Sequence, residues 1–311
     1  MAIEFRKLRH FVKVVDTGSI SRAASILRIA QPALSQQIVS LETHFRQKLL
    51  IRSNRGVVPT EAGLLFYRHA QTILKQFDQA QLDMSKSAST LGGRVSIGLG
   101  TYCALPSLSL NILSTMLSRH PNITVHITDS FGYIISESIM TGRMDLAAIC
   151  GLGPIKGVQL SPLFHEELFL VLPKNMLTSF QPDTPVQMRQ LNDLRILLPG
   201  NINYLRTVLN EAFIRARVTP SIVADIESTT VMGEAVAAGM GATVLPLSVA
   251  HQLGIPMEQI RPLSHPKVEV PTSLCVSDHL PMSEPVAAAR EVLLEVVNDF
   301  VQRQTQGVRR A

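Results

Sequence analysis

The segment 19–42, SISRAASILRIAQPALSQQIVSLE, constrains the fold most, because two short helical patterns stand on either side of IAQP. Ser19 follows Gly18 and is a favourable N-cap residue. Pro32 lies where the second pattern begins, and proline is well tolerated in a first helical turn, where its missing N–H has no intrahelical partner. We therefore predict two helices joined by a tight turn at 28–30, the second opening with Gln31 and Pro32.

The second helix has an apolar face and an outward face without charge. Its apolar positions are spaced by four, three and four residues, which is typical of one buried helical stripe. An ordinary solvated face carries Lys and Glu, whereas glutamine and serine side chains can bond base edges or phosphates. A second helix that enters the major groove by its N-terminal residues is the helix-turn-helix mode of DNA binding. The apolar stripe is Leu34, Ile38, Leu41 and Phe45, and the opposite face is Pro32, Ala33, Gln36, Ser40 and Thr43.

The next segment, LLIRSNRGVVP at 49–59, predicts a short hairpin with Pro59 as its end. Arg52 and Arg55 flank the tip beside Gly56, as expected of a wing that contacts the phosphate backbone or the minor groove. Two arginines in a turn are more often simply solvated, so the hairpin carries weight only together with the two helices. Combined, these elements predict a winged helix-turn-helix that binds double-stranded DNA.

The charge distribution supports a basic head on a near-neutral body. Residues 1–90 hold 13 Lys and Arg against 6 Asp and Glu, and residues 91–311 hold 16 against 18. This asymmetry is typical of a polyanion-binding module attached to a domain with another task, although a solvated basic face is the plain alternative.

A long helix is predicted over 60–88, and Gly92 and Gly93 indicate a hinge after it. Apolar residues alternate at spacings of four and three, which is a heptad seam and predicts a dimerisation helix. The alternative is a helix that packs on its own domain. The seam residues are Phe66, Ala70, Ile73, Phe77, Ala80 and Met84.

Beyond the hinge, strand and helix patterns alternate, which predicts parallel α/β sheets. Strands are expected at 94–100, 123–129, 144–150, 166–173 and 241–246, with helices near 203–215, 229–238 and 283–304. About 210 residues exceed one comfortable α/β core, so two lobes are expected.

Several classes of protein are disfavoured by what the sequence lacks. No run of about 18 apolar residues predicts a membrane span, and the N-terminus has no signal-peptide pattern. Cys103, Cys150 and Cys275 are odd in number and widely spaced, as expected of reduced thiols in a cytoplasmic protein. No nucleophile elbow, phosphate loop, complete dinucleotide motif or zinc-ligand spacing is present, so we expect no enzyme activity, no cofactor and no metal.

The stretch LRHFVKVVDTGSISRAASILRIAQPALSQQIVSLETHFRQKLLIRSNRGVVPTEAG, residues 8–63, resembles LysR-type transcriptional regulators. HEELFLVLP at 165–173 and GMGATVLP at 239–246 extend the resemblance, and IAQPALSQQ and LLIRSNRGVVPTEAG are similar to the nitrogen assimilation control subgroup. The resemblance implies a winged helix-turn-helix head at 1–59, a linker helix at 60–91 and a two-lobed, periplasmic-binding-protein-like α/β effector domain at 92–311. Lobe I is expected at about 92–163 and 269–302, and lobe II at about 164–268.

The resemblance also implies functional partners and sites. It implies a homodimer or homotetramer, contact with RNA polymerase, and an unknown small-molecule effector. The DNA-contacting positions of the family fall on Gln31, Pro32, Ala33, Ser35, Gln36, Arg52 and Arg55. Many members carry a basic residue where Gln36 stands, so the base preference of this chain is expected to differ.

Effectors of such folds bind between the lobes, where strands end and helices begin. The candidates are Thr101, Ser130, Phe131, Asn201, Asn203, Ser228 and Thr229. Each of the polar ones is equally explained as a helix N-cap. Phe131 stands where the family usually has a small hydroxyl residue, which predicts a narrower or filled pocket.

Two other readings remain open from the sequence. One is a DNA-binding architectural protein, or a regulator without an effector, with an inert body. The other is a solute-binding protein with an added helical head, against which the uncharged outward face of the second helix argues.

Overall fold

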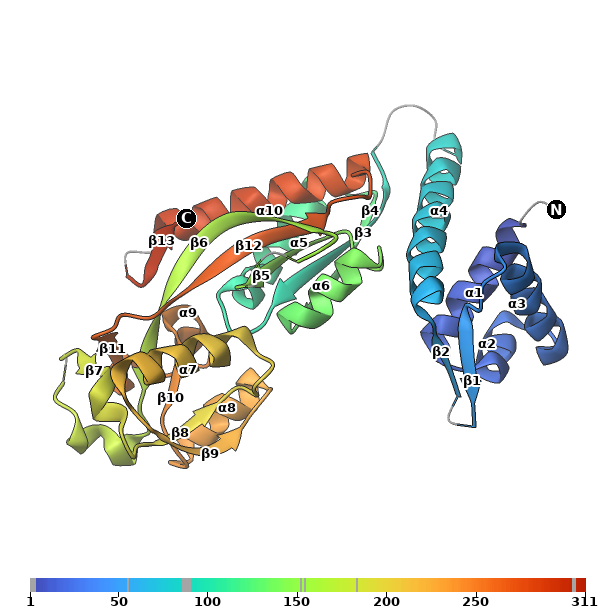
Figure 1. The fold of residues 1–311 in the computed structure, drawn as a ribbon. Coiled ribbons are helices and arrows are strands. Elements are labelled where there is room, and N and C mark those ends of the chain that lie inside the picture. The colour runs from blue at the N-terminus through green and yellow to red at the C-terminus, as the bar shows by residue number, and fades with distance from the viewer. Residues whose placement is uncertain are drawn as a thin grey trace. The chain divides into compact units, whose positions relative to one another are not determined.

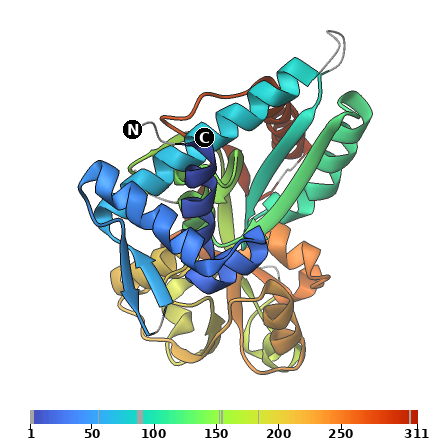
Figure 2. The same ribbon diagram turned by 90° about the vertical axis from the view of Figure 1, so that its right-hand side faces the viewer.

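The computed structural model describes residues 4–54, 56–85, 91–151, 153, 155–182, 184–303 and 306–311. These residues divide into two compact units. The head unit comprises residues up to Gly93 together with Met140–Arg143, and the body unit comprises Arg94–Ile139 and Met144–Ala311. Figures 1 and 2 show the helical head with its long helix, and the body with its large sheet.

The head is built from three short helices, a hairpin and one long helix, as predicted. Its helices α1 to α3 enclose an apolar core to which Leu49, Leu50 and Tyr67 also contribute. Ser19 caps α2 by accepting the N–H of Arg22, and Pro32 lies in the first turn of α3. The elements are α1 (Phe5–Thr17), α2 (Ile20–Leu27), α3 (Gln31–Phe45), β1 (Leu50–Ser53), β2 (Gly56–Pro59) and α4 (Glu61–Ser85).

Two glycines join the end of α1 to the hairpin. Gly18 ends α1 with a positive φ of 61°, and its carbonyl accepts the N–H of Val57 at 2.8 Å. A Cβ on Gly56 would lie 2.7 Å from that same carbonyl oxygen. Because real Cβ atoms do not approach so closely, Gly56 requires glycine, and the left-handed backbone at Gly18 favours it.

The body contains a nine-stranded sheet in the order β4-β3-β5-β12-β6-β11-β7, with β10 and β13 also paired to β6, and a separate parallel pair, β8 and β9. Its strands are β3 (Gly93–Gly100), β4 (Ile123–Ser130), β5 (Leu146–Cys150), β6 (Val158–Val171), β7 (Val186–Gln187), β8 (Arg195–Leu198), β9 (Ser221–Asp225), β10 (Thr243–Pro246), β11 (Ile260–Ser264), β12 (Glu269–Ser277) and β13 (Val308–Arg310). Its α-helices are α5 (Ser109–Arg119), α6 (Gly132–Met140), α7 (Tyr204–Ala216), α8 (Thr229–Ala237), α9 (Leu247–Gln252) and α10 (Glu284–Arg303). Short 3₁₀ helices lie at Leu105–Leu108, Lys174–Ser179, Met188–Leu191 and Met257–Gln259.

The expectation of parallel sheets is confirmed only in part, because the sheet of the body is mixed. β3 pairs with β5 in parallel, but β10, β11, β12 and β13 all pair antiparallel to β6. The chain passes from lobe I into lobe II through β6 and returns through β12, and these two strands pair antiparallel (Figure 1). The strand predicted at 166–173 is therefore only the second half of a longer one.

No helix among the described residues is long and apolar enough to cross a membrane. Within those same residues, no group of three or more His, Cys, Asp or Glu side chains is arranged to hold a metal ion.

Candidate nucleic-acid interface and interlobe cleft

The outward face of α3 begins at its first residue and is exposed. Leu34, Ile38 and Leu41 are buried in the head core, so the opposite face of the helix is turned away from it. The helix has no acidic side chain in its first turn, where an anion is favoured by the free N–H groups and the helix dipole. Of the predicted DNA-contacting residues on α3, Gln31, Pro32, Ala33 and Gln36 are exposed and Ser35 is half-buried.

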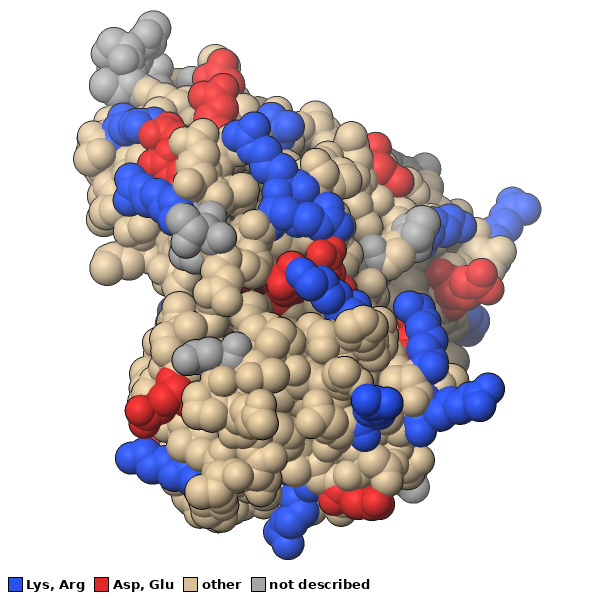
Figure 3. All heavy atoms as spheres, turned by 90° about the vertical axis from the view of Figure 1, so that its left-hand side faces the viewer, with Lys and Arg blue, Asp and Glu red and all other residues tan. Residues whose placement is uncertain are grey.

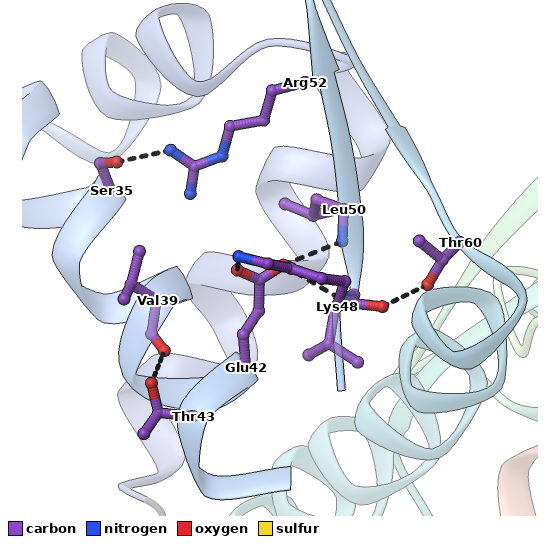
Figure 4. A network of polar contacts seen from close by, with 9 residues as sticks. Ser35, Val39, Glu42, Thr43, Lys48, Leu50, Arg52 and Thr60 are labelled. Carbon is purple, nitrogen blue, oxygen red and sulfur yellow. Dashed lines mark hydrogen bonds and ion pairs between the residues drawn. The ribbon is translucent and has the colours of Figure 1, made fainter. Parts of the chain in front are cut away.

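The wing arginine is joined to α3. Arg52 on β1 donates from Nη1 to the hydroxyl of Ser35 at 2.9 Å, as Figure 4 shows. The guanidinium therefore lies beside the first turns of α3 and extends the surface formed by Gln31, Pro32 and Gln36. Arg55, the second predicted wing residue, lies outside the described residues.

Glu42 is the residue of this site that sequence reasoning missed. Its side chain is 6% exposed, and Oε1 accepts the N–H groups of Leu49 at 3.0 Å and Leu50 at 3.2 Å. Oε2 forms an ion pair with Lys48 at 3.3 Å (Figure 4). One carboxylate near the end of α3 thus holds the start of the wing against the helix. The sequence signal was the single acid interrupting an uncharged helix beside Leu41.

Thr60 and Gly63 hold the wing close to the start of α4. The Thr60 hydroxyl donates to the carbonyl of Lys48 at 2.6 Å (Figure 4). It also accepts the N–H of Gly63 at 3.0 Å. A Cβ on Gly63 would lie 1.9 Å from the Leu49 carbonyl oxygen, so the close approach of α4 to the wing requires glycine. These contacts explain why a threonine and a glycine stand three residues apart in PTEAG.

The head covers the first part of the predicted dimerisation seam on α4. Ala70 is 0% exposed, and Phe66 packs against the head core, in ring contact with Phe11 and Phe45. The assignment of Phe66 and Ala70 to an intermolecular seam is therefore corrected, because α1 packs along this stretch of α4 in the same chain. Ile73, Phe77, Ala80 and Met84 remain candidates for the seam; Ile73, Phe77 and Met84 are exposed, although Phe77 also contacts Phe5.

The interlobe cleft is nearly filled by side chains of the body itself. The volume left in it is about 20 Å³, roughly enough for one water molecule. Tyr102 in lobe I donates its hydroxyl to the carbonyl of Ile226 in lobe II at 2.6 Å. The ring of Tyr204 in lobe II lies against Gly151 in lobe I so closely that a Cβ there would be 1.8 Å from it.

The structure brings only part of the predicted effector set to this cleft. Thr101, Phe131 and Asn203 line it, together with Tyr102, Tyr133 and Tyr204, which the sequence analysis did not select. Ser130, Asn201, Ser228 and Thr229 do not line it. Asn203 and Ser228 accept backbone N–H groups as the N-caps of α7 and α8, which was the alternative explanation.

One buried hydroxyl that lines the cleft has no partner among the residues that the structure describes. Thr101 Oγ1 is buried and makes no hydrogen bond to any described residue. Since buried hydroxyls are nearly always bonded, this atom is available to a ligand or a water. The rings of Phe131 and Tyr133 stand parallel, with centroids 6.0 Å apart, and narrow the space beside it.

Figure 3 shows how charged side chains are distributed over one face of the molecule. The face in Figure 3 shows charged side chains of both signs in its upper part, while the lower part, which is lobe II, has a broad area free of them. Lys and Arg side chains adjoin one another in the upper middle of this face, with acidic side chains directly below them.

Two family models match the chain where the sequence predicts them. Residues 5–64 match the bacterial regulatory helix-turn-helix protein model of the lysR family, and residues 88–298 match the LysR substrate binding domain. The chain belongs to the LysR family of bacterial transcriptional regulators. This confirms the predicted fold class, and the chain is accordingly a DNA-binding regulator with an effector domain and not an enzyme.

Relatives in the family agree over nearly the whole length. The nitrogen assimilation regulatory protein nac of Klebsiella aerogenes is 38% identical over 297 residues, covering 95% of this chain and 96% of that protein. The protein of the same name from Escherichia coli strain K12 is 35% identical over 305 residues, covering 98% of each chain. The resemblance to this subgroup is confirmed.

Solved structures of LysR regulators share the fold. A full-length variant of OxyR from Pseudomonas aeruginosa matches with a TM-score of 0.74 at 23% identity, covering 98% of this chain and 99% of that chain. Full-length CbnR complexed with its target DNA matches with a TM-score of 0.53 at 23% identity, covering 94% and 99%.

Arg52→Ala is expected to weaken binding to DNA of every sequence and to lower the slope of log affinity against log salt by about one unit, because one phosphate contact is lost. The measurement is DNA affinity across a salt series. Arg215→Ala is the matched control, since it removes an exposed arginine of the body and is expected to leave the slope unchanged. An unchanged slope in Arg52→Ala would remove Arg52 from the phosphate contacts.

Proposed function

We propose that the protein recognises interrupted inverted repeats in promoter DNA as a homodimer or homotetramer and controls transcription in the cytoplasm through contact with RNA polymerase. The observation that carries the proposal is the exposed, uncharged N-terminal face of α3 with Arg52 bonded beside it. An uncharged face of amide and small side chains can approach base edges closely, and the arginine supplies attraction to the backbone or a guanine edge. Dimers read two half-sites, which explains the need for a second copy.

We further propose that a small-molecule effector acts at the interlobe cleft. The unpartnered Thr101 hydroxyl supports this site. Binding requires the lobes to part, which breaks the Tyr102 contact to Ile226, or requires Tyr204 to leave Gly151. The filled cleft favours a second candidate, a regulator of the same DNA that needs no effector there.

The test of DNA recognition is selection. Fragments of the genome that encodes the protein are bound to the purified full chain at near-physiological salt, and the retained fragments are sequenced. Enrichment of inverted repeats whose halves are separated by whole helical turns is expected. Uniform retention without a repeat would instead support an architectural DNA-binding protein.

Gln36→Ala is expected to keep the fold and to relax sequence choice at one base position of each half-site by about 1–3 kcal/mol, because glutamine can pair bidentately with adenine. Affinities for the selected operator and for single-base variants of it measure this. Equal discrimination by mutant and parent would assign the contact to another residue.

Ile73→Glu is expected to shift the chain from dimer to monomer, because Ile73 is 44% exposed on the uncovered part of the α4 seam and a charge there cannot be buried at an interface. Analytical ultracentrifugation measures the shift. Thr72→Glu is the matched control, since Thr72 lies beside the seam and its hydroxyl bonds to the Arg68 carbonyl of the same helix. A variant that stays dimeric would place the dimer contact elsewhere.

A further inference from the structure

A groove in lobe II has room for a small molecule, unlike the interlobe cleft. It lies between the segment Leu177–Pro182 and the start of β11, and its volume is about 620 Å³. Volumes of a few hundred to about 1,000 Å³ are typical of small-molecule sites. Leu177 and Phe180 supply apolar walls, and Thr178 and Ser179 supply hydroxyl groups.

A buried arginine lines this groove. Arg261 is 3% exposed, and its guanidinium donates to three backbone carbonyls: Nε to Gln181 at 3.1 Å, and Nη1 to Glu258 at 2.8 Å and Ile260 at 3.0 Å. Nη2 has no hydrogen-bond partner among the described residues. Those residues also place no carboxylate within ion-pair distance of the side chain, unlike Arg206, which pairs with Asp225 at 2.8 Å.

Among the residues that the structure describes, the Arg261 guanidinium therefore has no carboxylate as a counter-ion. Arginine stays protonated in proteins, so the guanidinium is positive at every working pH. A buried charge is costly unless it is paired as well as hydrogen-bonded, and carbonyl groups supply dipoles but no opposite charge. An anion in the groove, bonded to Nη2, would complete the pairing.

We propose that this groove binds a small organic monocarboxylate, with the carboxylate at Arg261 and an apolar body between Leu177 and Phe180. Arg261 provides a single positive charge, and the exposed Glu258 also lines the groove. A phosphate or a dicarboxylate would meet that acid with a second negative charge, so a monoanion is favoured. The site is separate from the DNA-binding head and from the interlobe cleft, so it stands whether or not the proposed DNA function does.

Titration calorimetry of the full-length protein with 3-phenylpropionate tests the site, with 3-phenylpropionamide as the neutral probe of the same shape. We expect the acid to bind with one site per chain and a dissociation constant of about 1 mM or lower, and the amide to bind at least roughly tenfold more weakly. Glu258→Gln is expected to strengthen binding of the acid about threefold, because a like charge is removed. Phe180→Ala is expected to weaken it roughly fivefold, because apolar contact is lost.

Glu234→Gln on α8, an exposed acid that does not line the groove, is the matched control and is expected to change nothing. The key variants spare Arg261, because its three carbonyl contacts also hold the local backbone and its replacement could unfold the loop. The proposal is overturned if the acid shows no binding up to about 10 mM, or if acid and amide bind alike. It is equally overturned if Glu258→Gln and Phe180→Ala both leave the affinity unchanged, which would place the bound probe elsewhere.

Discussion

Replacing Glu42 by alanine is expected to detach the wing from α3 and to lower the free energy of unfolding of the head by about 3 kcal/mol, since hydrogen bonds to a buried charged group contribute about 1.5–3 kcal/mol each. The N–H groups of Leu49 and Leu50 would lose their acceptor in a buried place. Arg52, two residues further along β1, would no longer be held beside Ser35. We therefore expect faster amide exchange at Leu49 and Leu50 and a large loss of specific DNA affinity.

Two further variants distinguish the contribution of the ion pair from that of the backbone hydrogen bonds. Lys48→Ala removes the ion pair to Oε2 and keeps both backbone bonds, and because Lys48 is largely exposed we expect little change. Glu42→Gln keeps an oxygen acceptor without the charge, so its effect should lie between those of Lys48→Ala and Glu42→Ala. If Glu42→Ala exchanges its wing amides no faster than the parent, the wing is held by the Thr60 and Gly63 contacts instead.

Replacing Glu166 by glutamine is expected to remove a pH dependence from the stability of the body. Burial raises the pKa of this carboxyl to about 7, against smaller opposing effects of the Ser248 hydroxyl and the Ala104 N–H, both of which donate to it. The folded protein therefore holds a proton that the unfolded chain releases near pH 4.5. The proton binding favours the folded state at low pH, and this advantage is lost as the pH rises through about 7.

Protonation of Glu166 is expected to change the free energy of unfolding of the body by about 3 kcal/mol between pH 5 and pH 8. This figure follows from the difference between the folded and unfolded pKa values. Chemical unfolding of the body, followed at several pH values, measures it as the difference between Glu166→Gln and the parent. Glutamine preserves the shape and can still accept the Ala104 N–H, so the variant should gain stability relative to the parent only toward pH 8. Glu234→Gln serves as the control, and a stability difference independent of pH would mean that Glu166 does not titrate in this range.

Glu166 is also where the two lobes meet. It lies on β6, Ala104 belongs to lobe I and Ser248 belongs to α9 in lobe II. Its two carboxyl oxygens therefore accept one hydrogen bond from each lobe. The sequence showed HEELFLVLP only as a strand, because nothing local distinguishes the buried glutamate from the half-buried Glu167 beside it.

The recognition surface could be predicted in large part from the sequence. Residues three and four apart lie on one side of a helix whatever surrounds it, so the buried stripe of α3 also identified the face turned outward. Pro32 and the N-cap Ser19 set the starts of α3 and α2 through local backbone preferences, and both were confirmed. The charge excess of the first ninety residues pointed to the polyanion partner.

The other features of the head depend on contacts between elements that are distant in the sequence. Whether Ala70 faces a second copy or its own head depends on where α1 packs, and a heptad spacing is the same in both cases. The bond between Ser35 and Arg52 joins residues 17 positions apart, and Glu42 bonds the wing only because the chain turns back after α3.

The sequence by itself determined the family, the helix-turn-helix and the exposed face of α3, because each depends on local spacing and local backbone preference. Only the tertiary structure decided that β6 and β12 cross between the lobes as an antiparallel pair and that Tyr204 against Gly151 fills the cleft. It also decided that Arg261 is buried without a carboxylate partner among the described residues. These outcomes depend on which distant segments share the same space, and packing in three dimensions settles that where periodicity along the chain does not.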